Sequence, residues 1–350
     1  TSYYQTMSKI HFLQVKHGDA FVIECNRGNH NGIIVVDGGP CGCGYVLSNK
    51  IKELGVPDLL ILTHYDDDHI GGILQWIKQC LDDGTSPYKK IWANCAGYVE
   101  FNAGLSTSAT DGVKLSKHLN VLKKQGLEWK DDLFEGYKED LSFAMIEVVS
   151  PTENVRDMVI KRQEDEGGQI FQTAATKRSN ADLEKSFEEL VIDDPAQPNL
   201  AKNDELANAS SVAFILRCDN LSILMLGDSY PHNIETYLRS VGYSEERPLE
   251  VDYVKVSHHG SRNNISNSLL DIIKCNQYLI STNGGKGKSN HPDRTAIAHI
   301  LCHPKRDLKE KIQLIFNHKI KLIEKNGAPF LKSGECENYN FEILENITEL

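Results

Sequence analysis

The stretch that decides the fold is Thr63-His-Tyr-Asp-Asp-Asp-His-Ile-Gly-Gly72. It follows the apolar run 58–62, typical of a buried strand, and it leads into a helix expected over 70–80. Between His64 and His69 lie two imidazoles and three carboxylates, all oxygen or nitrogen ligands for a divalent cation. The alternative is a solvated acidic loop, but that many carboxylates would repel one another without a cation. We therefore predict a metal site here.

Other strands of buried type also end in polar turns. The run 33–36 stops at Asp37-Gly-Gly, the run 221–226 at Gly227-Asp228, and the run 251–256 at Ser257-His258-His259-Gly. Layered α/β folds build their sites from such strand ends. We therefore expect these turns to meet the 63–72 loop at one edge of the molecule.

Composition excludes several classes of protein. The chain has 350 residues and a net charge of −11, from 38 basic and 49 acidic side chains, so a basic coat for nucleic acid is excluded. No apolar run is long enough for a transmembrane helix, and no signal peptide precedes Met7. The nine cysteines form no Cys-x-x-Cys pair, which argues against a zinc finger. We expect a cytoplasmic protein with reduced cysteines and no membrane partner.

The chain reads as strands with helices between them, which predicts sheets covered by helices in one domain over 7–345. Residues 1–6 read as a short extension or a remnant of cloning. Residues 152–207 carry 13 acidic and 7 basic side chains, and we expect a partly helical, partly mobile insertion, with an acidic helix over 182–190. We also expect a helix over 267–274 and a terminal hairpin from 311–316 and 319–324.

Taken in order, these motifs resemble the metallo-β-lactamase fold, whose signature is H-x-H-x-D-H after a strand. Here Asp66 replaces the second His of that signature. That variant resembles the signature of the hydrolase domain of ComEC-type competence proteins. Five further motifs carry the same resemblance: Val15-x-x-Gly-Asp-Ala20, Asp37-Gly-Gly, Gly227-Asp228, Ser257-His-His-Gly-Ser261 and His291-Pro292. The resemblance runs from about residue 9 to 301. It implies an αββα sandwich with two metal ions at one edge, and hydrolysis of phosphodiesters, above all in nucleic acid.

The resemblance also implies a role for each residue. His64 and Asp66 would hold the first metal, Asp68 and His69 the second, and Asp228 would bridge them. Because side chains alternate along a strand, only one of His258 and His259 is expected as a ligand. We favour His259, with His258 near the scissile phosphate. Asp37 would orient the ligating loop by hydrogen bonds. The expected catalytic residues are Asp68, His258 and His291. Contacts to phosphates are expected from Arg262, Lys286 and Lys288.

Two departures from the pattern matter. No His stands where the wider fold supplies another ligand to the first metal; the stretch 208–211, Asn-Ala-Ser-Ser, occupies that place. Asp for His makes the first site harder, which favours Mn²⁺ or Mg²⁺ relative to Zn²⁺ at that site. For the two sites together we expect two divalent ions, Zn²⁺ or Mn²⁺, with Mg²⁺ also open. His17, in the first turn, could also approach the metals.

Three functions stay open on the sequence. The first is a soluble nuclease acting on DNA, in anti-phage defence or DNA processing. The second is a hydrolase of a small phosphoester or cyclic nucleotide, and the third is a binding module without catalysis. The acidic insertion suggests regulated access, relieved by a partner protein or a protease. The sequence predicts no oligomeric state.

Overall fold

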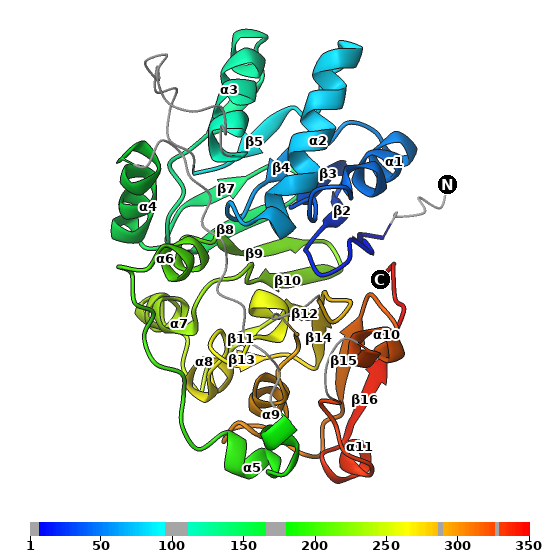
Figure 1. The fold of residues 1–350 in the computed structure, drawn as a ribbon, viewed down its shortest axis with the longest axis vertical. Coiled ribbons are helices and arrows are strands. Elements are labelled where there is room, and N and C mark those ends of the chain that lie inside the picture. Colours follow the sequence, from blue (N-terminus) through cyan, green and yellow to red (C-terminus); the bar gives the residue numbers. More distant parts are fainter. Residues whose placement is uncertain (1–6, 95–110, 166–179, 286–289, 326–328) are drawn as a thin grey trace.

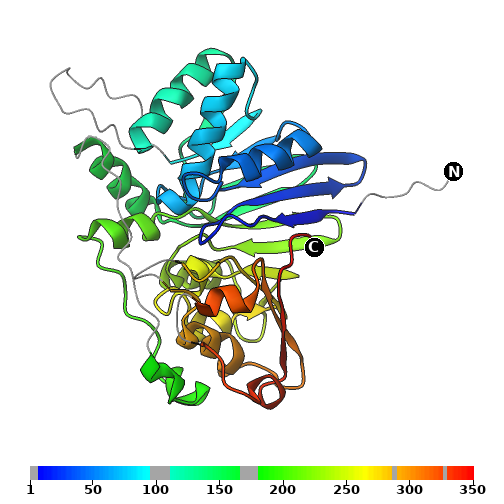
Figure 2. The same cartoon turned by 45° about the vertical axis from the view of Figure 1, so that its right-hand side comes forward.

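The computed structural model describes residues 7–94, 111–165, 180–285, 290–325 and 329–350. Two β-sheets lie face to face, with helices on both outer faces (Figures 1 and 2). Among the described residues, no helix has both the length and the apolar character needed to cross a membrane.

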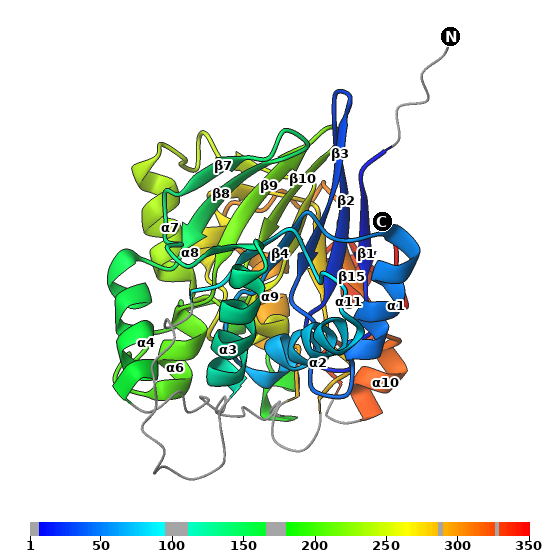
Figure 3. The ribbon, with the colours of Figure 1, turned by 90° about the horizontal axis from the view of Figure 1, so that it is seen from above.

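The first sheet is built from the N-terminal part of the chain. Its strands stand in chain order: β1 (Lys9–Phe12), β2 (Phe21–Arg27), β3 (His30–Val36), β4 (Leu59–Ile61), β5 (Lys90–Trp92) and β6 (Glu128–Lys130). From β3 onward neighbouring strands are parallel, so their carboxyl ends lie at one edge. The helices α1 (Gly44–Leu54), α2 (Asp67–Asp83) and α3 (Asp111–Lys124) lie over this sheet (Figure 3).

The second sheet has the order β16-β15-β14-β12-β10-β9-β8-β7. The bounds are β7 (Lys138–Asp140), β8 (Met145–Ser150), β9 (Ala213–Cys218), β10 (Leu221–Met225), β12 (Tyr253–Lys255), β14 (Gln277–Ile280), β15 (Ile312–Phe316) and β16 (Phe341–Leu344). A short pair, β11 (Leu249–Glu250) and β13 (Ile273–Lys274), lies apart from it. The covering helices include α7 (Pro231–Ser240), α8 (Asn267–Leu270), α9 (Arg294–Cys302) and α11 (Glu335–Asn338).

Apolar side chains fill three layers. Between the sheets, Phe12 stacks on Phe21 at 4.9 Å, and the buried Trp92 belongs to the same apolar cluster. Ile73 and Ile77 of α2 are buried in a second cluster against the first sheet, and Ile297 and Ile300 of α9 in a third against the second sheet. Burial of apolar side chains in all three layers is what holds a four-layer structure together. The predicted αββα sandwich is confirmed.

The acidic insertion, residues 152–207, contributes to both outer layers. Its helices α4 (Glu153–Asp165) and α6 (Asn203–Ala209) lie together near α3 (Figure 3). The expected helix over 182–190 is interrupted: a 3₁₀ turn (Asn180–Leu183) precedes α5 (Phe187–Leu190), because Ser186 caps α5 with Glu189 in a capping box. The buried Arg294 of α9 holds the segment 182–185 by donating hydrogen bonds to the backbone carbonyls of Asp182 and Lys185.

Two expectations near the C-terminus were wrong. The terminal hairpin does not form: β15 pairs in parallel with β14 and β16, and residues Ile320–Lys325 form helix α10. Ile320 and Ile323 share one face of that helix, the spacing by which a helix buries apolar side chains. The helix expected over 267–274 ends at Leu270, and β13 follows it because Ile273 pairs with Leu249.

Candidate metal centre

The polar turns meet at one edge of the sandwich. Because β3 and β4 are parallel, Asp37 and Thr63 leave their strands side by side, and the Asp37 carboxylate accepts hydrogen bonds from the Thr63 amide at 2.8 Å and its hydroxyl at 2.7 Å. The loop after Thr63 enters α2 at Asp67, which sets His69 in the first turn of a helix. Asp228 and the 257–260 turn arrive from the second sheet, after β10 and β12.

The imidazoles of His64 and His69 face Asp228. Their Nε2 atoms lie 3.8 and 3.3 Å from Asp228 oxygens, and these three ligand atoms form one compact group. Asp66 lies beside it, with a carboxylate oxygen 3.7 Å from His64 Nε2. All four side chains are buried.

A second group of ligand atoms shares His69. It joins Asp68, His69 and His259, with Asp68 3.1 Å from His259 Nε2 and 3.9 Å from His69 Nε2. Buried His64 Nε2, His69 Nε2 and Asp228 Oδ1 make no hydrogen bond within the described part of the chain. Buried polar atoms without partners are costly, and a bound cation would satisfy these three. The residues present therefore fit a divalent metal centre.

Hydrogen bonds fix which nitrogen of each imidazole faces the centre. His69 Nδ1 donates to Asp37 at 2.7 Å and His259 Nδ1 donates to the Ser281 carbonyl at 2.8 Å, so their Nε2 atoms are presented as ligands. On His64, Nδ1 lies 3.1 Å from the Thr63 hydroxyl and 3.4 Å from that of Ser211. Ser211 comes from the stretch that replaces the missing His.

Charge inside the centre shows what a cation would do. Burial disfavours protonation of His69 and His259. Nevertheless Asp228, Asp37 and Asp68 raise the pKa of His69 well above its ordinary value, and Asp19 and Asp68 raise the pKa of His259 to about 10. Burial likewise opposes ionisation of Asp228, yet His69 and His258 hold its pKa well below the usual range. In the protein without metal, protonated imidazoles thus neutralise the carboxylates, which is the role a cation would take over.

The paired histidines do not alternate. Strand β12 ends at Lys255, and both His258 and His259 adopt left-handed backbone conformations, with φ of 47° and 54°. In that turn both rings face the centre, and His258 Nε2 lies 3.7 Å from Asp228. The expectation that the two point in opposite directions was therefore wrong. Burial lowers the pKa of His258 to about 4, so its ring is neutral near pH 7.

Sequence reasoning gave no role at the site to two charged residues beneath the centre, Asp19, which belongs to the motif over 15–20, and Lys255. Lys255 is fully buried, forms an ion pair with Asp19, donates to the Gly227 carbonyl at 3.0 Å and lies 4.0 Å from Asp228. Burial raises the pKa of Asp19, but Lys255 and His259 hold it at about 2. A lysine within the apolar run 251–256 was the available signal, since lysine is almost never buried without a partner.

The remaining expected residues have three different outcomes. His17 and His291 line a cavity of about 120 Å³ with Asp68, His258, His259, Thr282 and Gly285. Arg262 is ion-paired with Asp182 and lies 3.7 Å from Asp293, so its charge is already compensated by carboxylates. Lys286 and Lys288 lie outside the described residues.

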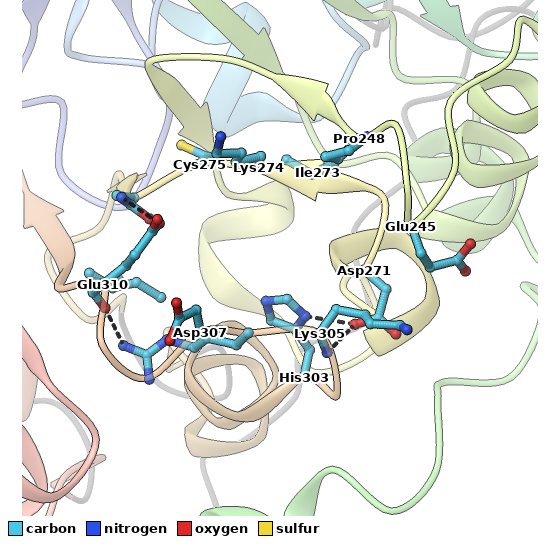
Figure 4. Close-up of a pocket in the computed structure, with 13 residues that line it drawn as sticks. Glu245, Pro248, Asp271, Ile273, Lys274, Cys275, His303, Lys305, Asp307 and Glu310 are labelled. Atoms are coloured by element: carbon cyan, nitrogen blue, oxygen red, sulfur yellow. Dashed lines mark hydrogen bonds and ion pairs between the residues drawn. The ribbon is translucent and has the colours of Figure 1, made fainter.

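A different cavity, of about 200 Å³, opens where β14 and β15 begin, at the end of these strands remote from the centre (Figure 4). Its polar groups are bound to one another: His303 lies 2.7 Å from Asp271, and Asn276 donates to Glu310 at 3.1 Å. Among the described residues, this cavity holds no group of facing metal-ligand atoms such as those at the metal edge.

No family model matches the chain, and no curated protein matches it. Solved structures do. The chain is similar to the metallo-β-lactamase fold protein YhfI from Bacillus subtilis, with 9% identity, 99% of this chain and 100% of that chain covered, and a TM-score of 0.39. It is also similar to Zn²⁺-bound PqqB from Methylobacterium extorquens, with 9% identity, 98% and 99% covered, and a TM-score of 0.44. It is similar as well to a long form RNase Z from yeast, with 13% identity, 100% of this chain and 42% of that chain covered, and a TM-score of 0.37. At these values the likeness says nothing about activity.

Proposed function

We propose that the chain is a metal-dependent phosphodiesterase that cleaves DNA. The observation that carries the proposal is the pair of adjacent ligand groups, His64, His69 and Asp228 on one side and Asp68, His69 and His259 on the other. Two divalent ions held there would activate water and clamp a phosphate. The ligand sequence resembles ComEC-type hydrolase domains, which is the ground for choosing DNA. Asp66 in place of His favours Mn²⁺ or Mg²⁺ over Zn²⁺ at the first site.

The chain's own residues prepare the reaction. His258 donates from Nδ1 to Asn264 Oδ1 at 3.1 Å, and Asn264 donates to the Asp228 carbonyl at 2.8 Å, so the ring is held with Nε2 toward the centre. Because that ring is neutral near pH 7, Nε2 can accept a proton. His291 lies next to it, with ring centroids 5.2 Å apart, where it can donate a hydrogen bond to the leaving oxygen. Asp37 and Thr63 keep His69 from rotating.

The experiment is a substrate panel. Plasmid DNA, single-stranded DNA, RNA and bis(p-nitrophenyl) phosphate are each incubated with protein and Mn²⁺, Mg²⁺ or Zn²⁺. We expect DNA cleavage that Asp68→Ala abolishes, since this variant loses a ligand of the second group while its fold stays intact. Lys78→Ala, on the exposed face of α2, is the control and should keep wild-type rates. Cleavage of the aryl ester without cleavage of any nucleic acid would instead support a small phosphoester as substrate.

A further inference from the structure

A cavity of about 300 Å³ adjoins the metal centre on the side of the acidic insertion. His258 lines both this cavity and the smaller one over the centre, so the two are neighbours that share one imidazole. The other walls come from the insertion at 196–198 and 202–208, from Tyr230, and from the loop 261–264. Its size is at the lower end of the range for small-molecule sites, which is roughly 300–1,000 Å³.

The insertion wall is anchored rather than loose. The carboxylate of Asp194 accepts hydrogen bonds from the amides of Asn267 at 2.6 Å and Ser268 at 3.2 Å. The next residue, Pro195, accepts at its carbonyl a hydrogen bond from His232 at 2.9 Å. Asp194 and Pro195 are therefore held against α8 and α7, and residues 196–198, which follow them directly, line the cavity.

The lining suits a neutral, hydrogen-bonding group. Asn208 lines the cavity and is 3% exposed, and its Oδ1 is a buried acceptor with no hydrogen-bond partner in the described chain. Gln197 and Asn263 add amides at the exposed mouth. Lys202 is paired with Glu205 at 2.8 Å, which leaves the Asp204 carboxylate as the excess charge. A second phosphate would be repelled here, whereas sugar hydroxyls and base amino groups donate to such acceptors.

We propose that this cavity binds the nucleoside attached to the scissile phosphate, an inference that rests on the proposed phosphodiesterase function. The phosphate lies at the metal centre and the base and sugar enter the cavity past His258. A base inside a duplex is stacked and paired, and it reaches such a cavity only after leaving the stack. The cavity therefore selects single strands, chain ends or short nucleotides over the interior of a duplex.

The test uses a matched pair of substitutions in the insertion. Ala196 is exposed and lines the cavity, so Ala196→Trp places a ring across its mouth without disturbing the core. Ala201 is also exposed but does not line the cavity, so Ala201→Trp is the control. For thymidine 5′-(p-nitrophenyl phosphate), Ala196→Trp should lower kcat/KM at least about tenfold. For bis(p-nitrophenyl) phosphate, which has no nucleoside, the change should stay within about twofold. Ala201→Trp should change neither.

A binding measurement separates this inference from the proposed activity. Saturation-transfer NMR with adenosine and thymidine, on protein without added metal, should show base-proton saturation for wild type and Ala201→Trp and its loss for Ala196→Trp. Absence of saturation in wild type, or equal saturation in Ala196→Trp, would overturn the inference. An equal loss of kcat/KM in Ala196→Trp for the thymidine ester and for bis(p-nitrophenyl) phosphate would also overturn the inference. Hydrolysis of neither ester by wild type with any of the three metals would refute the proposed function, while the NMR result still decides the cavity.

Discussion

The ion pair beneath the metal centre makes the strongest stability prediction. Lys255→Met removes a fully buried ammonium and leaves the Asp19 carboxylate buried without its main partner. It also removes the hydrogen bond to the Gly227 carbonyl at 3.0 Å and a cation that lies 4.0 Å from Asp228 Oδ1. The variant thus isolates one charge and loosens the turn that carries the Asp228 carboxylate.

Removing one partner of a buried ion pair costs about 3–5 kcal/mol. With an unfolding entropy of about 2.1 cal/mol/K per residue over 350 residues, that loss lowers Tm by about 4–7 °C. The matched control is Lys274→Met. Lys274 pairs with Glu250 at 3.3 Å, but its side chain is 57% exposed, so its loss should leave Tm unchanged within error.

The assay is thermal and urea denaturation of metal-free protein, for both single variants and for Lys255→Met combined with Asp19→Asn. Because Asn carries no charge, the double variant has no isolated carboxylate, and it should be more stable than Lys255→Met alone. The coupling between the two positions should be at least about 1 kcal/mol. Additive losses, or a Lys255→Met variant as stable as Lys274→Met, would refute the idea that this ion pair supports the centre.

Three further predictions concern the centre itself. Elemental analysis after reconstitution with Mn²⁺ or Zn²⁺ should find up to two ions per wild-type chain and fewer in His69→Ala, since His69 belongs to both ligand groups; equal content in the two proteins would contradict this. Without metal, the pKa of His259 is about 10 and the pKa of His69 is also raised. Protonation of these two imidazoles therefore stabilises the metal-free fold, fully so at a pH below about 6.5, the pKa of histidine in the unfolded chain. This stabilisation is lost as the pH rises through the pKa values of the folded protein. Metal binding at pH 7 should then release at least one proton, measured by calorimetry in buffers of different ionisation enthalpy; a buffer-independent enthalpy would refute it. Gly72→Ala should reduce stability and metal content together, because an added Cβ would lie 1.9 Å from the Gly38 carbonyl oxygen; unchanged metal content would show that the 63–72 loop tolerates the shift.

Strand ends and the residues of the 63–72 loop could be predicted because the apolar runs before them are continuous. The orientation of His258 and His259 could not, because alternation applies only while a chain stays extended, and this chain leaves the extended conformation after Val256. Asp19 illustrates a different difficulty. Its partners Lys255 and His259 are more than 230 residues away, and only the packing of the two sheets brings them together. The partner strands of β15 are nearer in the chain, but neither is the segment that directly follows it, since Gln313 pairs with Gln277 and Ile312 with Phe341.

Each sheet supplies only half of the centre. His64, Asp66, Asp68 and His69 follow β4 of the first sheet, whereas Asp228 and His259 follow β10 and β12 of the second. During synthesis, Asp68 therefore emerges 191 residues before the His259 that it faces, a delay of roughly 10–40 s at 5–20 residues per second. The first sheet can pair and bury its helices in that interval, since its strands are consecutive in the chain. The carboxylates of Asp66 and Asp68 then stand without Asp228 and His259 until the second sheet is synthesised. A growing chain therefore assembles the complete set of ligands only when the second sheet packs against the first.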